Sequence, residues 1–249
     1  MADAKAADTP EKRRGVGIAW GGFNVTEGGG DSAEVALELM PGNKIRKYDT
    51  WHAMGQGATT GSLVVTLEAL KEMHLTPEDI QLIQNDTKTC PDTGMAGASR
   101  SLYMDGNATI IAANKLLAAM RKEDGTLRTY DEMKAEGIET KYLGRYETNT
   151  TPGLCRLDPN TGIGDPTPAF TYCLNLAEVE VDTKTGKTTV LKFTCVDFVG
   201  RIGNIDAVNG QAYSGIMHGI GFALQTLRNM PTCSALVLPT SRMFRMILT

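Results

Sequence analysis

Three stretches of the chain combine small residues with side chains that can hydrogen-bond a ligand. They are Gly55, Gln56 and Gly57; Gly97, Ala98, Ser99 and Arg100; and Gly210 with Gln211. Small residues let a backbone approach a ligand closely, glutamine offers donors and an acceptor, and arginine offers a fork of N–H donors. These residue types suit a polar or anionic ligand that is held mostly by hydrogen bonds.

The neighbouring sequence predicts that each stretch joins a strand to a helix. The first amides of a helix point at whatever lies beyond its end, and the helix dipole favours negative charge there. Each stretch also has a purely structural explanation: a glycine-rich connection at 55–57, an N-cap at Ser99, and close helix packing around Gly215. The ligand hypothesis therefore depends on the three stretches together.

The sequence contains no pattern typical of a metal ion coordinated by side chains or of a catalytic nucleophile. His52, His74 and His218 have no ligand spacing with one another, and the five cysteines contain no C-x-x-C pair. The chain also lacks a phosphate-binding P-loop, a G-x-S-x-G elbow and a G-x-G-x-x-G in a βαβ unit. We assign no metal ligand and no catalytic residue.

Hydrophobic periodicity predicts the elements that position these stretches. It indicates strands at 14–22, 33–39, 44–50, 80–85, 170–182 and 187–197, and helices at 61–74, 99–120, 130–136 and 207–225. Turns at 41–43 and 183–186 should make two hairpins, and the rest of 121–165 should be a surface excursion. Strands and helices mix without strict βαβ alternation, so the expected class is α+β, with mixed sheets and packed helices.

The expected organisation has three parts. Residues 1–13 are a disordered lead-in, residues 14–225 are the main region, and residues 226–249 are an atypical tail. The main region is expected to hold one domain, or two subdomains divided near 121–165. The tail is basic where the rest of the chain is acidic. We interpret it as the product of a truncation or a reading-frame change.

The overall charge narrows the class of partner. A net charge of -4 and a pI near 5.5 disfavour nucleic acid and acidic membrane surfaces. The chain has no apolar run of about 18 residues, and its first residues do not resemble a secretory signal. The odd number of cysteines disfavours a disulfide framework. The expected location is the cytoplasm, with the periplasm as the alternative.

Taken in order, the motifs resemble the molybdenum cofactor-binding region of the xanthine oxidase family. The matching elements are Met54-Gly55-Gln56-Gly57, the loop from Thr87 to Arg100 with its Cys-Pro-Asp-x-Gly core, and the helix sequence from Asn204 to Gly215. The sequence of these segments is most similar to that of the aldehyde oxidoreductases of sulfate-reducing bacteria. The resemblance covers roughly residues 14–225.

The resemblance implies a molybdenum held by the dithiolene of a pterin, in the molybdopterin cytosine dinucleotide form. Hydrogen bonds to pterin and phosphates would come from Gly55, Gln56, Gly57, Gly97, Ala98, Ser99, Arg100 and Gln211. The implied reaction hydroxylates a small aldehyde to a carboxylic acid with oxygen from water, and electrons leave through 2Fe-2S clusters to an electron-acceptor protein. A purine or another N-heterocycle is the alternative substrate.

Two departures from the family pattern limit what this chain does alone. The family's general base, a Glu in a Gly-Val-Gly-Glu element, has no counterpart, and Glu27 does not match it. The 2Fe-2S domains and half of the cofactor-binding region are also missing. The expected partners are therefore the missing segments or a second copy in a homodimer. A different class of function, a non-catalytic fragment that needs a partner chain, is the other alternative.

Overall fold

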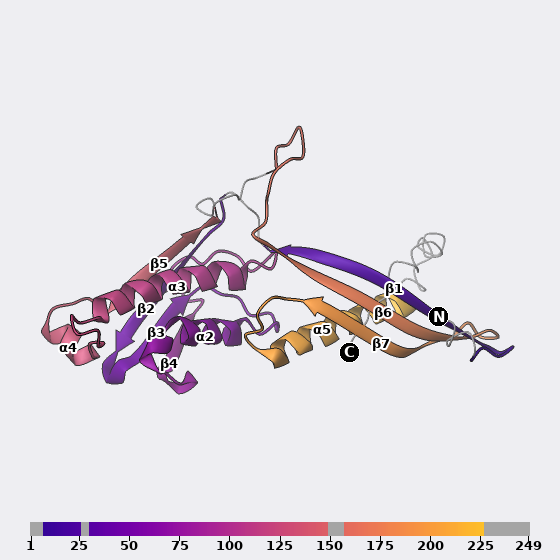
Figure 1. Ribbon diagram of the computed structural model, residues 1–249, viewed down its shortest axis with the longest axis horizontal. Coiled ribbons are helices and arrows are strands. Elements are labelled where there is room, and N and C mark those ends of the chain that lie inside the picture. Colours follow the sequence, from indigo (N-terminus) through magenta and orange to yellow (C-terminus); the bar gives the residue numbers. More distant parts are fainter. Residues whose placement is uncertain (1–6, 26–29, 149–156, 227–249) are drawn as a thin grey trace. The chain divides into compact units, whose positions relative to one another are not determined.

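The computed structural model describes residues 7–25, 30–148 and 157–226, and the structural statements below refer to these residues. They form two compact units (Figure 1). The larger unit holds the described residues of 24–170, and the smaller unit holds those of 1–23 and 171–249. This division differs from the expected one, because the described residues of 121–165 belong to the larger unit. Of the expected tail, 227–249 lies outside the described residues.

A four-stranded mixed sheet forms the centre of the larger unit. Its strands are β2 (Ser32–Met40), β3 (Lys44–Asp49), β4 (Ile80–Gln84) and β5 (Lys141–Glu147), in the order β4-β3-β2-β5. β2 is antiparallel to β3 and β5, and β3 is parallel to β4. The β2–β3 connection is tight because Gly42 adopts a left-handed φ of 76°. The hairpin predicted at this turn is confirmed.

Two long helices pack on one face of this sheet. They are α2 (Ala58–Ala69) and α3 (Ser101–Met120), and the short helix α4 (Tyr130–Ala135) follows α3 in the chain (Figure 1). Alternate residues of β2 face the helices: Leu37 and Leu39 share one buried cluster with Leu116 of α3. Single turns of 3-10 helix at Lys71–Met73 and Pro77–Asp79 connect α2 to β4. The predicted helices are confirmed, although α2 begins three residues before the expected start.

Strand β5 corrects the expectation that its segment is a surface excursion. It pairs with β2 from Ser32 to Glu38 and closes one edge of the sheet. A Cβ on Gly144 would lie 2.0 Å from the carbonyl oxygen of Ala108 in α3. Because no side chain fits in that space, glycine is what lets β5 and α3 approach so closely.

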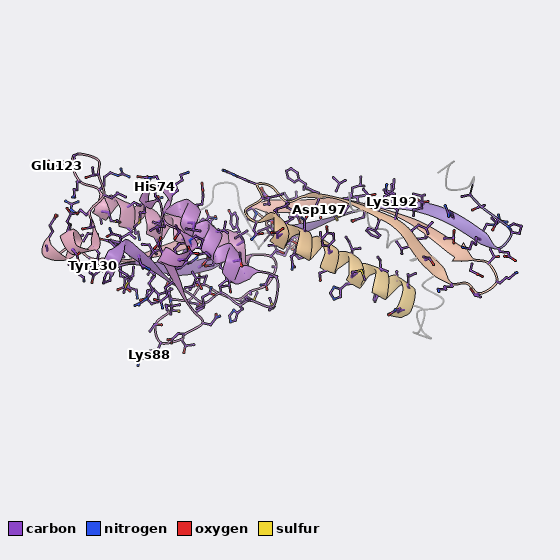
Figure 2. The ribbon with its side chains drawn as sticks, turned by 90° about the horizontal axis from the view of Figure 1, so that it is seen from below. His74, Lys88, Glu123, Tyr130, Lys192 and Asp197 are labelled. Carbon is purple, nitrogen blue, oxygen red and sulfur yellow. The ribbon has the colours of Figure 1, made fainter. Side chains whose placement is uncertain are left out.

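A three-stranded sheet and one helix form the smaller unit. The strands are β1 (Lys12–Val25), β6 (Ala169–Asp182) and β7 (Thr188–Phe198), in the order β1-β6-β7, and α5 (Ile205–Gly221) runs beside them (Figure 2). A π-helical turn, Phe222–Thr226, follows α5. β6 and β7 are antiparallel, which confirms the second predicted hairpin.

Strand β1 begins at Lys12, inside the expected lead-in, where Lys12 and Arg14 both pair with Glu180 of β6. Because both units combine β-sheet with helix, the predicted α+β class is confirmed. No helix in the described part of the chain is long and apolar enough to cross a membrane.

Candidate cofactor-binding site

Helices α2 and α3 begin at the same end of the larger unit. A Cβ on Gly61 would lie 3.6 Å from Leu102, and a Cβ on Gly106 would lie 3.7 Å from Val65. One contact thus joins the first turns of the two helices, and the other joins their second turns. The helices run parallel, so the loops that lead into them, 51–57 and 96–100, lie side by side.

The loop before α2 is shaped by its two glycines. Gly55 and Gly57 adopt φ values of 98° and 84°, and Gly57 is the N-cap of α2 with no side-chain cap. The Gln56 side chain accepts a hydrogen bond from the Met54 amide and donates one to the His52 carbonyl at 3.0 Å. The side chain of Gln56 therefore fixes its own loop, with one N–H left for another acceptor.

The loop before α3 takes an unusual backbone conformation. Ala98 and Ser99 both lie in the left-handed region, with φ values of 47° and 51°, and both are exposed. The N-cap of α3 is Arg100, which makes no side-chain cap bond. The structural explanation of Ser99 as an ordinary N-cap is therefore wrong. Neither α2 nor α3 has a side-chain cap, so the amides of their first turns are left for solvent or a ligand.

The Arg100 side chain is buried, and its hydrogen bonds are all made within the protein. Its side chain is 4% exposed, and it makes a two-point ion pair with Asp31 at 2.6 and 2.8 Å. Its other donors reach the carbonyls of Ser32, Thr93 and Met95, which accounts for all five N–H groups of the guanidinium. A Cβ on Gly94 would lie 2.7 Å from this guanidinium. Arg100 thus holds the 93–99 loop against β2, and donating to a phosphate would require one of these bonds to break.

Further hydrogen bonds join the segments that lead into the two loops. The Thr50 amide donates to the Thr93 hydroxyl at 2.9 Å, and the Thr93 amide donates to the Thr50 hydroxyl at 2.8 Å. Asn85 donates to the Trp51 carbonyl at 3.2 Å. Lys88, in the same long connection, projects to the surface (Figure 2). The segments that lead into the two loops are therefore held together by hydrogen bonds.

Gln211 is the predicted site residue that belongs to the smaller unit. It lies on α5 in the smaller unit, where its side chain is exposed. Helix α5 begins at Ile205, and the Asn204 side chain caps it by accepting from the Ala207 amide at 3.0 Å. The expectation that Gln211 marks a helix entrance is therefore wrong, because it lies in the second turn. The remaining predicted residues all lie in the larger unit.

A fully buried ion cluster lies between β3 and the two helices, and the sequence analysis did not identify it. Lys47 Nζ lies 2.7 Å from the carboxylate of Asp105 and 3.4 Å from that of Asp49, and all three side chains are inaccessible to solvent. Ser62 of α2 donates to Asp49 at 2.8 Å. Burial raises the pKa of Asp105 to about 6, against the lowering effect of Lys47.

Two buried polar atoms near this cluster have no hydrogen-bond partner among the described residues. They are Nε1 of Trp51 and Oδ1 of Asp105. Trp51 is 4% exposed, and its ring lies beside Gly61 in the first turn of α2. An unpaired buried N–H or oxygen costs stability, so such atoms are normally hydrogen-bonded. Here one donor and one acceptor remain available for a partner from outside the chain.

These features fit a cofactor whose phosphates and pterin are held by hydrogen bonds. The exposed loop residues carry no large side chain at Gly97, Ala98 and Ser99, so a flat group can reach the amides. No group of three or more His, Cys, Asp or Glu side chains in the described ranges could hold a metal ion. A metal that arrives on an organic cofactor needs no such cluster.

Comparison with known proteins identifies the family. The molybdopterin cofactor-binding domain family matches residues 1–226. The chain is 38% identical over 221 residues to the aldehyde oxidoreductase of Megalodesulfovibrio gigas, which is 89% of this chain and 24% of that protein. It is 25% identical over 234 residues to the gamma subunit of the 6-hydroxypseudooxynicotine dehydrogenase complex of Paenarthrobacter nicotinovorans, covering 85% of this chain and 28% of that protein.

A comparison with a solved structure identifies the same family. The crystal structure of the aldehyde oxidoreductase from Desulfovibrio desulfuricans superposes with a TM-score of 0.83 at 40% identity, over 88% of this chain and 24% of that chain. The chain thus spans about a quarter of the length of these relatives. The resemblance seen in the motifs is confirmed: the chain belongs to the molybdopterin cofactor-binding domain family, within the xanthine oxidase family of molybdenum enzymes.

Proposed function

We propose that this chain is the molybdenum-binding part of an aldehyde oxidoreductase that hydroxylates small aldehydes to carboxylic acids with oxygen from water. The paired N-termini of α2 and α3, both without side-chain caps, carry the proposal. Two parallel helices that begin side by side can supply backbone donors and two dipoles to the same anion. The 38% identity to an aldehyde oxidoreductase supports the aldehyde as substrate.

The cofactor that we propose is molybdopterin cytosine dinucleotide. Backbone amides of 57–60, 97–99 and 101–103 would hold its diphosphate, and the remaining N–H of Gln56 would reach a polar group of the pterin. Gln211 of the smaller unit remains a predicted cofactor-binding residue, and Arg100 would position the 93–99 loop from inside the larger unit. When bound, the molybdenum centre supplies oxygen transfer and accepts two electrons from the substrate.

The rest of the enzyme would come from outside this chain. We assign no general base here, because Gly-Val-Gly-Glu is absent from the sequence. We propose that the 2Fe-2S clusters, the path to an electron-acceptor protein and the base lie on segments that complete the relatives' length. These segments would be joined to this chain or supplied by a partner subunit. The cytoplasm is the proposed location, consistent with free thiols at Cys90, Cys173 and Cys195.

Substitution of Ala98 tests the cofactor site directly. Ala98 is exposed and left-handed, a conformation that aspartate and asparagine both tolerate, so neither variant should disturb the fold. Ala98→Asp places a carboxylate beside the proposed phosphate position, whereas Ala98→Asn has the same shape without the charge. The full chain would be produced in a host that makes the cofactor, and molybdenum and acid-released CMP would be measured per chain.

We expect wild type and Ala98→Asn to carry cofactor. Ala98→Asp should carry less, because a like-charge contact of about 1.4 kcal/mol lowers the affinity for the cofactor about ten-fold. Equal occupancy in the two variants would contradict the proposed site.

The alternatives predict different results in the same experiment. A purine or N-heterocycle hydroxylase would carry the same cofactor but oxidise those compounds in place of aldehydes once complete. A non-catalytic fragment would hold no molybdenum alone and would acquire it only with a partner chain. The aldehyde comes first because of the 38% identity to an aldehyde oxidoreductase.

A further inference from the structure

We propose that anion binding at the paired N-termini of α2 and α3 is coupled to the uptake of one proton by the buried cluster of Lys47, Asp49 and Asp105. This inference rests on the proposed function, because the anion site is the one proposed there for the cofactor's phosphates. It goes further by assigning a regulatory role to side chains that would not touch the cofactor.

The cluster lies directly behind the anion site. Asp105 is the fifth residue of α3, and Ser62, which donates to Asp49 at 2.8 Å, is the fifth residue of α2. Four residues of helix correspond to about 6 Å along the axis. An anion that accepts from first-turn amides would therefore lie roughly 10 Å from the Asp105 carboxylate, through protein and not through water.

The charges in the cluster do not balance. One ammonium, Lys47, faces two carboxylates, and all three groups are fully buried. With both carboxylates ionised the cluster carries one excess negative charge, which would repel an anion at the helix ends. A proton on Asp105 makes the cluster neutral. Its Oδ1 has no partner among the described residues, so a proton can be added there without breaking a hydrogen bond.

No other charged group in the described structure faces the cluster from the elements packed on it. Besides Lys47 and Asp49, β3 and β4 contribute the amide of Gln84, and the helices contribute the hydroxyls of Ser62, Thr66 and Thr109. The positions of β5 on the helix side are Tyr142, Gly144 and Tyr146, since they pair with buried residues of β2.

The acidic residues of β2 lie elsewhere. Glu34 and Glu38 alternate with the buried positions of that strand and bond Arg145 and Tyr48 on the outer face. The protonation of Asp105 therefore depends on the charges of the cluster itself. When the anion binds, one proton from solvent adds to the Asp105 carboxylate, and no other bond forms or breaks.

Sulfate is a suitable probe, because it keeps its double charge between pH 5 and pH 8. Its affinity for the full chain would be measured at both values by amide chemical shifts in 57–60 and 97–103. Wild type should bind at least ten-fold more weakly at pH 8 than at pH 5, because even one pair of unit charges roughly 10 Å apart at an effective dielectric constant of about 20 repels by more than a ten-fold change in affinity, and sulfate carries two charges. Asp105→Asn mimics the protonated state, so it should bind with one affinity at both values, equal to that of wild type at pH 5.

Asp131→Asn is the matched control. Asp131 lies in the first turn of α4, next to Tyr130, at the other end of α3 (Figure 2). It should keep the pH dependence of wild type. The Asp105 carboxyl carbon signal gives a second reading in wild type, in which saturating sulfate should raise the titration midpoint.

The outcomes separate the two levels of the proposal. The proton coupling alone would be overturned if sulfate bound at these amides with the same pH dependence in wild type and in Asp105→Asn. In that case the titration midpoint of Asp105 would also be unchanged by sulfate. Absence of any sulfate-induced shift at these amides would overturn the proposed anion site and the coupling with it.

Discussion

The ammonium of Lys47 lies 2.7 Å from the carboxylate of Asp105 in a space that solvent does not reach. This pair joins the central strand β3 to α3 one turn beyond the helix's N-terminus. Asp49 makes the corresponding link to α2 through Ser62. The cluster therefore fixes both helix ends against the sheet, and two of the predictions below concern it directly.

Asp105 should make the stability of the fold fall as pH rises from about 4 to about 6. Burial raises its folded-state pKa from 3.8 to about 6, so the folded chain binds more protons than the unfolded chain between these values. By linkage, the free energy of unfolding contributed by this group is largest below the unfolded pKa and is lost as pH rises through the folded one. The change is about 3 kcal/mol at 1.4 kcal/mol per pKa unit.

Urea unfolding of wild type and Asp105→Asn across this range checks the prediction. Other carboxylates, such as Glu132 with its pKa lowered to about 2, change stability in the opposite direction in both proteins. The difference between the two proteins isolates Asp105. A difference that stays constant with pH would show that Asp105 titrates normally.

Lys47→Met should destabilise the chain by about 3–5 kcal/mol, because it leaves two buried carboxylates without their cation. Adding Asp105→Asn to this variant removes one of those carboxylates and should recover a large part of the loss. Thermal and urea unfolding of the single and double variants measure both effects. A loss below about 1 kcal/mol in the single variant would mean that the ion pairs contribute little.

Gly144→Ala should cost at least 3 kcal/mol, or prevent folding, because the new methyl group would lie 2.0 Å from the Ala108 carbonyl. Gly215→Ala is the matched control: it lies within α5, where a Cβ meets nothing within 4 Å. That change should stabilise the helix by up to about 1 kcal/mol. Equal melting temperatures for the two variants would contradict the close approach of β5 to α3.

Arg100→Lys should loosen the 93–99 loop and weaken anion binding without removing a direct contact. Lysine cannot reproduce the two-point pair with Asp31 together with three carbonyl bonds. We expect a stability loss of about 1–3 kcal/mol. Faster amide hydrogen exchange at 93–99 should accompany it. If Arg100→Lys weakens sulfate binding while exchange in this loop is unchanged, Arg100 contacts the anion itself.

Much of the fold could be predicted from the sequence because periodicity and turn residues agree with it. The β2–β3 hairpin and α3 follow directly from alternation, Gly42 and helical spacing. Strand β5 was missed because its helix-facing positions are Tyr142, Gly144 and Tyr146, which give no aliphatic signal. Its glycine is explained only by the nearby α3 backbone, which is distant in sequence.

The candidate site was predictable in outline and not in detail. The glycine-rich stretches at 55–57 and 97–100 do lead into helices, as predicted, and the general chemistry of helix N-termini is what suggested a ligand there. The left-handed pair Ala98–Ser99 and the internal role of Arg100 depend on Asp31 and on carbonyls elsewhere in the fold. The buried Lys47 was not considered because lysine is almost always exposed.

The central claim is that the paired N-termini of α2 and α3 hold the cofactor's diphosphate. Titration of the labelled full chain with cytidine diphosphate, followed by amide NMR, tests it most directly. We predict saturable shifts concentrated at 57–60 and 97–103, present in Ala98→Asn and lost in Ala98→Asp. Shifts confined to other parts of the chain, or identical in the two variants, would contradict the claim.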